Sequence, residues 1–186
     1  MYMNKQKGFT IIELVVAMGV FLSLFLIVIV NFRSGESVNE LRLETQKVAS
    51  DIRKVQTLAL TGSNYNGISM GIGGYGISFY KDDNNYIIFT DNVADGIYVE
   101  ADDTLMETRT LVPNITSLNF DPTYDELHIV FQPYSSNVSI YGVDGFGESF
   151  LQADTTSLYM THLRAVSKTG VASITPVSGR VDFELQ

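Results

Sequence analysis

The sequence contains no cysteine and no tryptophan, and basic residues are scarce. Without cysteine the chain can form no disulfide and can carry out no thiol chemistry. Lysine and arginine number 12 against 21 acidic residues, which gives a formal net charge of −9 at pH 7. Binding to nucleic-acid phosphates needs a basic patch, so this balance disfavours a nucleic-acid partner. There are only two histidines and no nucleophile, phosphate-loop or zinc motif, so we expect neither an enzyme nor a cofactor.

Charge is nearly absent from one stretch close to the amino terminus. Residues 9–30 carry a single charged side chain, the carboxylate of Glu13. As a helix these residues would be about 33 Å long, enough to cross the hydrocarbon core of a bilayer. A charge at the centre of a membrane helix costs about 2.5–3.5 kcal/mol, and somewhat less near an end. Glu13 is therefore a candidate functional residue whose cationic partner must be found.

The residues around Glu13 carry a family resemblance. The segment KGFTIIELVVAM resembles the amino terminus of type IV pilins and type II secretion pseudopilins. The resemblance implies that a prepilin peptidase cuts after Gly8 and methylates the new amino terminus on Phe9, so that Lys5 and Lys7 belong to a removed basic leader. It also implies that Glu13 meets the Phe9 amine of a neighbouring subunit in a filament. Pairing the two charges lowers the cost of burying either of them.

Two other interpretations of this end are open. An ordinary secretory signal peptide has a shorter apolar region and an A-x-A-like cleavage site, which is missing here. An uncut membrane anchor explains the apolar run but leaves Glu13 and the Gly8-Phe9 junction without a role. Because Lys5 and Lys7 precede the apolar run, the leader is expected in the cytoplasm and the rest across the membrane. The expected location is the cytoplasmic (inner) membrane, crossed once, with the carboxy-terminal domain on the periplasmic or extracellular side, and then a filament.

Apolar residues recur at helical spacing beyond the membrane segment. They are Val38, Leu41, Val48, Ile52, Val55 and Ala59. This stripe predicts an amphipathic helix that packs against a globular core, and a coiled coil is the weaker alternative. Gly35 lies between the membrane segment and this amphipathic segment. Glycine lowers helix propensity by about 1 kcal/mol relative to alanine. Gly35 is therefore either a candidate hinge or an ordinary surface glycine. The helix is expected to end at Thr61-Gly62.

The remaining sequence alternates short strand-like runs with turns rich in Gly, Asn and Asp. The expected strands are residues 75–80, 86–90, 97–100, 105–111, 115–120, 126–131, 138–141, 158–166, 171–175 and 180–185. The predicted fold is α+β, with a long N-terminal helix packed on an antiparallel, β-sandwich-like domain. The expected organisation is a cleaved leader (1–8), a transmembrane or filament-core helix (9–30), its amphipathic continuation (31–61) and an exported β-rich domain (62–186).

Loose motifs in the β-rich region resemble H-type minor pseudopilins and FimT-like minor pilins. They lie at residues 74–77, 86–91, 95–98 and 178–181. The resemblance implies a structural subunit of a type II secretion or type IV pilus system. Its partners would be the prepilin peptidase, other pilin or pseudopilin subunits and an inner-membrane assembly platform.

Two alternatives belong to a different class of function. One is a FimT-like minor pilin that binds DNA for uptake, and the other is an uncleaved, membrane-anchored binding domain. The last motif contains a single arginine, Arg180, where DNA-binding members carry more basic residues. Residues 62–186 hold five basic and sixteen acidic side chains, a net charge of −11, which disfavours DNA.

One segment partly matches the template of a Ca²⁺-binding loop. Asp91, Asp95 and Asp102 occupy positions 1, 5 and 12 of a Ca²⁺-loop template with Gly96 at position 6, but Val93 at position 3 cannot coordinate through its side chain. A plain turn is the preferred interpretation, so no metal is predicted. His128 and His162 fall in strand-like runs and are interpreted as structural residues, because catalysis would require a carboxylate or hydroxyl partner close in space.

Overall fold

The computed structural model describes residues 9–186 except 121–123, 146, 151–155, 166 and 176–178, and omits the side chains of 30–34, 116–118 and 148–150. The chain divides into two compact units, Met1–Glu36 and Ser37–Gln186. A single helix, α1 (Ile11–Thr61), contributes to both units. The helix remains α-helical at Gly35, where an added Cβ would have no atom within 4 Å.

Local hydrogen bonds close the carboxyl end of α1. At the carboxyl end the N–H of Ser63 donates to the Leu58 carbonyl (3.3 Å) and the N–H of Gly62 to the Ala59 carbonyl (3.4 Å). With Gly62 at a φ of 63°, this is the Schellman arrangement, which glycine adopts without steric cost. The end predicted at Thr61-Gly62 is confirmed, and the start lies at Ile11, two residues after the expected Phe9.

The rest of the second unit consists of ten antiparallel strands among the described residues. They are β1 (Gly74–Tyr80), β2 (Asn85–Asp91), β3 (Thr104–Thr110), β4 (Ile115–Asn119), β5 (Glu126–Phe131), β6 (Val138–Asp144), β7 (Gly147–Phe150), β8 (Thr156–His162), β9 (Thr169–Thr175) and β10 (Arg180–Leu185). One sheet has the order β3-β2-β1-β5-β6-β7 and the other β10-β9-β8-β4. The predicted α+β fold, a long N-terminal helix with antiparallel sheets packed on it, is therefore confirmed.

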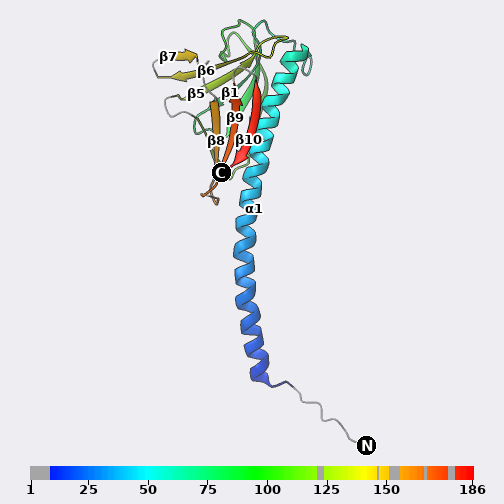
Figure 1. Cartoon of the computed structure of the whole chain (residues 1–186), viewed down its shortest axis with the longest axis vertical. Helices are drawn as coiled ribbons and strands as arrows, with labels where there is room; N and C mark the ends of the chain where they lie inside the picture. The colour runs from blue at the N-terminus through cyan, green and yellow to red at the C-terminus, as the bar shows by residue number, and fades with distance from the viewer. Residues whose placement is uncertain (1–8, 121–123, 146, 151–155, 166, 176–178) are drawn as a thin grey trace, which may run out of the picture. The chain divides into compact units, whose positions relative to one another are not determined.

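The core of the second unit lies between α1 and the two sheets. The helix contributes Leu41, Val48, Ala49, Ile52, Val55 and Ala59, all fully buried. Val38 is half-buried, so the predicted stripe is buried nearly throughout. The helix runs beside β9 and β10 (Figure 1), and a Cβ at Gly170 of β9 would come within 2.0 Å of Thr45 Oγ1. Arg53 of the helix donates to the Val181 carbonyl of β10 at 2.5 Å, which satisfies a backbone acceptor on this edge strand.

A polar seam joins the helix to the other sheet. The Tyr86 hydroxyl on β2 donates to the Asp51 carboxylate at 2.7 Å, and both residues are buried. Arg109 on β3 forms two ion pairs. Its Nε lies 3.7 Å from Asp51 Oδ2 and its Nη2 lies 3.1 Å from Glu107 Oε1. Lys54 reaches Glu107 at 3.7 Å. These contacts orient β2 and β3 on the helix surface.

The structure corrects two of the expected strands and adds one that was not expected. Residues 97–100 form a loop and not a strand, because the Asp103 carboxylate accepts the N–H groups of Val99 and Asn92 (both 2.9 Å) and turns the backbone. The strand expected at 158–166 runs from Thr156 to His162, with turns at 163 and 164, and Val166 lies outside the described residues. Strand β7 was not predicted.

Candidate functional site

The first turn of α1 is built around Thr10 and Glu13. Thr10 is the N-cap: its carbonyl accepts the N–H of Leu14 (3.2 Å) and its Oγ1 accepts the N–H of Glu13 (3.3 Å). A threonine three residues before a glutamate is the capping-box sequence, a signal that the sequence analysis missed. A carboxylate in the first turn is also favoured by the positive end of the helix dipole. The sequence thus gives Glu13 a local structural role beside its predicted role in assembly.

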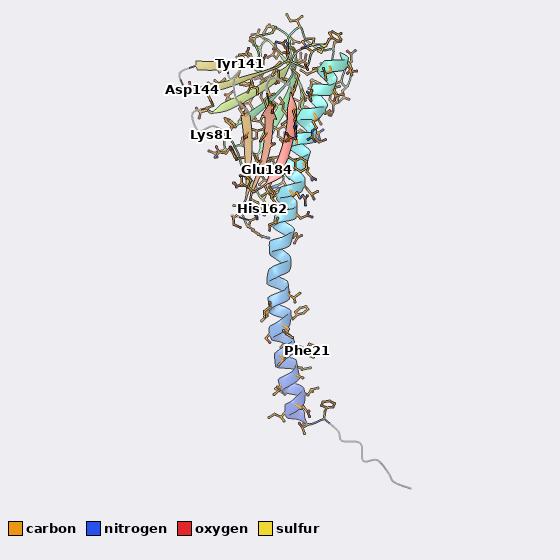
Figure 2. The ribbon with its side chains drawn as sticks, viewed as in Figure 1. Phe21, Lys81, Tyr141, Asp144, His162 and Glu184 are labelled. Atoms are coloured by element: carbon orange, nitrogen blue, oxygen red, sulfur yellow. The ribbon has the colours of Figure 1, made fainter. Side chains whose placement is uncertain are left out.

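The helix that follows is apolar on every side. Residues 11–29 have a mean hydropathy of 2.8, and none of these residues is buried in the described part of the chain. Figure 2 shows side chains projecting to both sides of this segment, Phe21 among them. A helix that is hydrophobic all round must be covered by lipid or by other protein. By length and composition this helix can cross a membrane.

Of the residues with a predicted role in processing, the structure describes Phe9 alone. Gly8, Lys5 and Lys7 lie outside the described residues. Phe9 is described and is 84% exposed, four residues before Glu13. Within the described part of the chain, the Glu13 carboxylate makes no ion pair. Its predicted partner, the Phe9 amine of another subunit, stays a prediction.

The structure gives both histidines the carboxylate partners that the sequence could not show. Arg164 donates its N–H to His162 Nδ1 (3.0 Å), so His162 Nε2 carries the proton and donates to Glu40 Oε2 (3.0 Å). This bond, the largest influence on Glu40, lowers the pKa of its carboxyl. Since Glu40 is on α1 and His162 ends β8, the pair fastens the helix to the four-stranded sheet.

His128 lies in a similar chain of contacts with Ser78 and Glu126. The N–H of Tyr98 donates to His128 Nδ1 (3.4 Å), so the Ser78 hydroxyl also donates to that nitrogen (2.6 Å), while Nε2 faces Glu126 Oε2 at 3.2 Å. Burial lowers the pKa of His128 to about 4, which keeps the ring neutral. Ser78 and His128 are 0% and 1% exposed, so both side chains are enclosed by the fold. The residues link β1, β5 and the loop at Tyr98.

Two of the three acids of the weak Ca²⁺ candidate, Asp91 and Asp95, accept hydrogen bonds from backbone N–H groups. Asp91 accepts from the N–H groups of Ala94 (2.6 Å) and Gly96 (3.1 Å), and Asp95 accepts from Ile97 (3.2 Å). Asp102 contributes its backbone carbonyl, which accepts from the Asn92 side chain at 3.1 Å. Among the described residues, no three His, Cys, Asp or Glu side chains are grouped so that they could hold a metal ion.

Comparison with known proteins identifies the amino-terminal motif. The family model of the prokaryotic N-terminal methylation motif matches residues 3–29, which include Gly8, Phe9 and Glu13. No curated protein and no solved structure shows a significant match to the chain. The motif supports a processed subunit of the type IV pilin or pseudopilin kind, structural in role, and it implies processing by a prepilin peptidase and assembly with other pilin subunits in a membrane.

Proposed function

We propose that the chain is a minor pseudopilin or pilin-like subunit that is cut after Gly8, methylated on Phe9 and assembled into a short helical filament of a type II secretion or type IV pilus system. The observation that carries the proposal is the methylation motif at residues 3–29. It is supported by the lone Glu13 carboxylate on a helix whose apolar side chains are exposed on every side.

The proposed role of Glu13 follows from the charge that processing creates. Cleavage after Gly8 leaves a positive amine on Phe9, immediately before the N-cap Thr10. When exposed helices of several subunits pack together, Glu13 and the amine both enter apolar surroundings. An unpaired ion there costs several kcal/mol, and pairing with the amine of a neighbour offsets much of that cost. An uncut chain has no such amine.

Substitutions at Glu13 and Thr10 distinguish the charge-pairing role of Glu13 from its helix-capping role. Glu13→Gln removes the charge but keeps a side chain that suits the third position of a capping box. Thr10→Ala removes the N-cap, at about 1 kcal/mol of helix stability, and keeps the charge. We expect both variants to be cut and methylated, Glu13→Gln to be excluded from filaments and Thr10→Ala to enter them. Filament incorporation is measured by crosslinking or shearing from cells that carry the complete machinery.

The opposite pattern would refute the charge-pairing role. If Glu13→Gln enters filaments as well as the wild type while Thr10→Ala does not, Glu13 acts as a helix-capping residue. The matched control for Glu13→Gln is Glu13→Asp, which also changes the side chain but retains the negative charge.

Within the pilin-like class, we assign the chain to the H-type or FimT-like minor subunits, with an inner-membrane assembly platform among its partners. The DNA-binding alternative is not favoured by the charges of the second unit. Arg180, the one basic residue of the late motif, is paired with Asp182 at 2.7 Å. Failure of the chain to bind double-stranded DNA at low salt would agree with this assignment, and tight, salt-sensitive binding would reverse it.

A further inference from the structure

The six-stranded sheet has a second buried region, on the face turned away from α1. Residues 92–103 form a loop across this face, with the Tyr98 ring 5.2 Å from Phe89 and the Tyr98 N–H on His128. The loop borders a cavity of about 250 Å³. Its walls include Ile72, Asp91, Gly96, Val130, Ser139 and Tyr141. Tyr141 is on β6 (Figure 2), so strands β2, β5 and β6 all contribute.

Among the described residues, Asp91 is the only charged one in the cavity wall. It is 1% exposed, and its two oxygens accept one backbone N–H each, from Ala94 and Gly96. A carboxylate offers about four acceptor positions, so two hydrogen bonds leave part of its capacity unused. No lysine, arginine or histidine of the described residues forms an ion pair with Asp91.

The surroundings add to the cost of this negative charge. Burial, and after it the carboxylates of Asp103 and Asp95, raise the pKa of Asp91, against the two N–H bonds that lower it. Buried charges in proteins are normally paired with a charge of opposite sign or bound to a metal. A cation that enters the cavity would therefore relieve an unfavourable interaction already present in the fold.

We propose that the cavity beside Asp91 binds the ammonium group of a lysine side chain presented by a partner polypeptide. A polypeptide is favoured over a free amine because an apolar side chain of the cavity wall, Ile72, is 74% exposed. Exposed apolar groups beside a polar pocket suit a partner whose basic residue has apolar neighbours. The inference does not rest on cleavage at Gly8 or on filament assembly.

The test uses the full-length, uncut chain in detergent micelles, labelled with ¹⁵N. The amide signals of Ala94 and Gly96, whose N–H groups donate to Asp91, report on the cavity. Three probes are titrated: the capped tripeptide Leu-Lys-Leu, the same peptide with norleucine in place of lysine, and putrescine. We expect saturable shifts of both amides with the lysine peptide, none with the norleucine peptide, and weaker binding of putrescine.

Variants locate the site on the chain. Ser139→Phe fills the cavity from β6 without touching the Asp91 hydrogen bonds, and should weaken binding by about tenfold or more. Glu100→Gln removes an exposed acid from the same loop and should leave binding unchanged. Asp91→Asn removes the charge at constant size, and its amide spectrum shows whether the loop is intact.

Each other outcome overturns the proposal. Equal shifts with the norleucine peptide would mean that no ammonium is recognised. Putrescine binding as tightly as the lysine peptide would identify a site for free amines. Saturation of the same amides by Ca²⁺, without a response to lysine, would identify a metal site. Unaffected binding in Ser139→Phe, or no shift with any probe, would show that the cavity is not a site.

Discussion

Lowering the pH should decrease the stability of the fold through His128, which is buried and neutral. Burial lowers the pKa of His128 to about 4, from 6.5 in the unfolded chain. At pH 7 neither state binds the proton. As the pH falls through 6.5 the unfolded chain takes up a proton at this position and the folded chain does not, so the free energy of unfolding decreases. The loss is complete near pH 4, below which both states are protonated.

The size of the effect follows from the two pKa values. The interval from 6.5 to about 4 corresponds to about 3–3.5 kcal/mol of unfolding free energy, at about 1.4 kcal/mol per pH unit. His128 is 1% exposed, so solvent screens this effect little. Glu126 and Asp91 act in the opposite direction. Burial raises the pKa of each carboxyl, so acidification removes a destabilising charge from the fold.

The assay is therefore a difference between the wild type and His128→Gln. Urea unfolding of the full chain in detergent, followed by tyrosine fluorescence, is measured from pH 7 to pH 4. We expect the stability advantage of the wild type at pH 7 to shrink by about 3 kcal/mol over this range. A Glu126→Gln background controls for coupling between Glu126 and His128.

A constant difference between the two proteins across the pH range would refute this reasoning. NMR gives an independent reading, since the chain has only two histidines and His162→Gln assigns their signals. An imidazole of His128 that titrates near 6.5 would contradict its burial in a neutral form.

Three further substitutions test other parts of the structure. Tyr86→Phe deletes the 2.7 Å hydrogen bond to buried Asp51 and should cost about 1–3 kcal/mol in urea unfolding; an unchanged midpoint would mean that Asp51 is solvated. Gly76→Ala would place a Cβ 2.3 Å from the Phe89 ring and should destabilise the second unit by about 1–3 kcal/mol, and no loss would show that the ring can move. Gly35→Ala meets no atom within 4 Å and should stabilise the helix by about 1 kcal/mol, so a defect in filament incorporation would support a hinge at Gly35, and normal incorporation would exclude it.

Much of the fold could be predicted because the responsible signals are local. The stripe from Leu41 to Ala59 has helical spacing, and Thr61-Gly62 carries the helix stop signal, so the structure matches both. The strand at 180–185 alternates along its length and was placed correctly. The capping box at Thr10 was equally local and was overlooked.

Other features depend on contacts between distant residues. Residues 97–100 look like a strand, yet Asp91 and Asp103 take the backbone N–H groups of this loop. Neither His128 with Ser78 nor His162 with Glu40 could be paired in advance, because 50 and 122 residues separate the partners. The cavity at Asp91 arises where three strands and a loop meet, and no sequence spacing encodes it.

The most direct test of the proposed function is the intact mass and amino-terminal sequence of the membrane-extracted protein, made in cells with and without a prepilin peptidase. A chain that begins at Phe9 and carries one added methyl group, only when the peptidase is present, is the predicted result. A chain that begins at Met1 in both cells would contradict it, and the protein would then be an uncut, membrane-anchored domain.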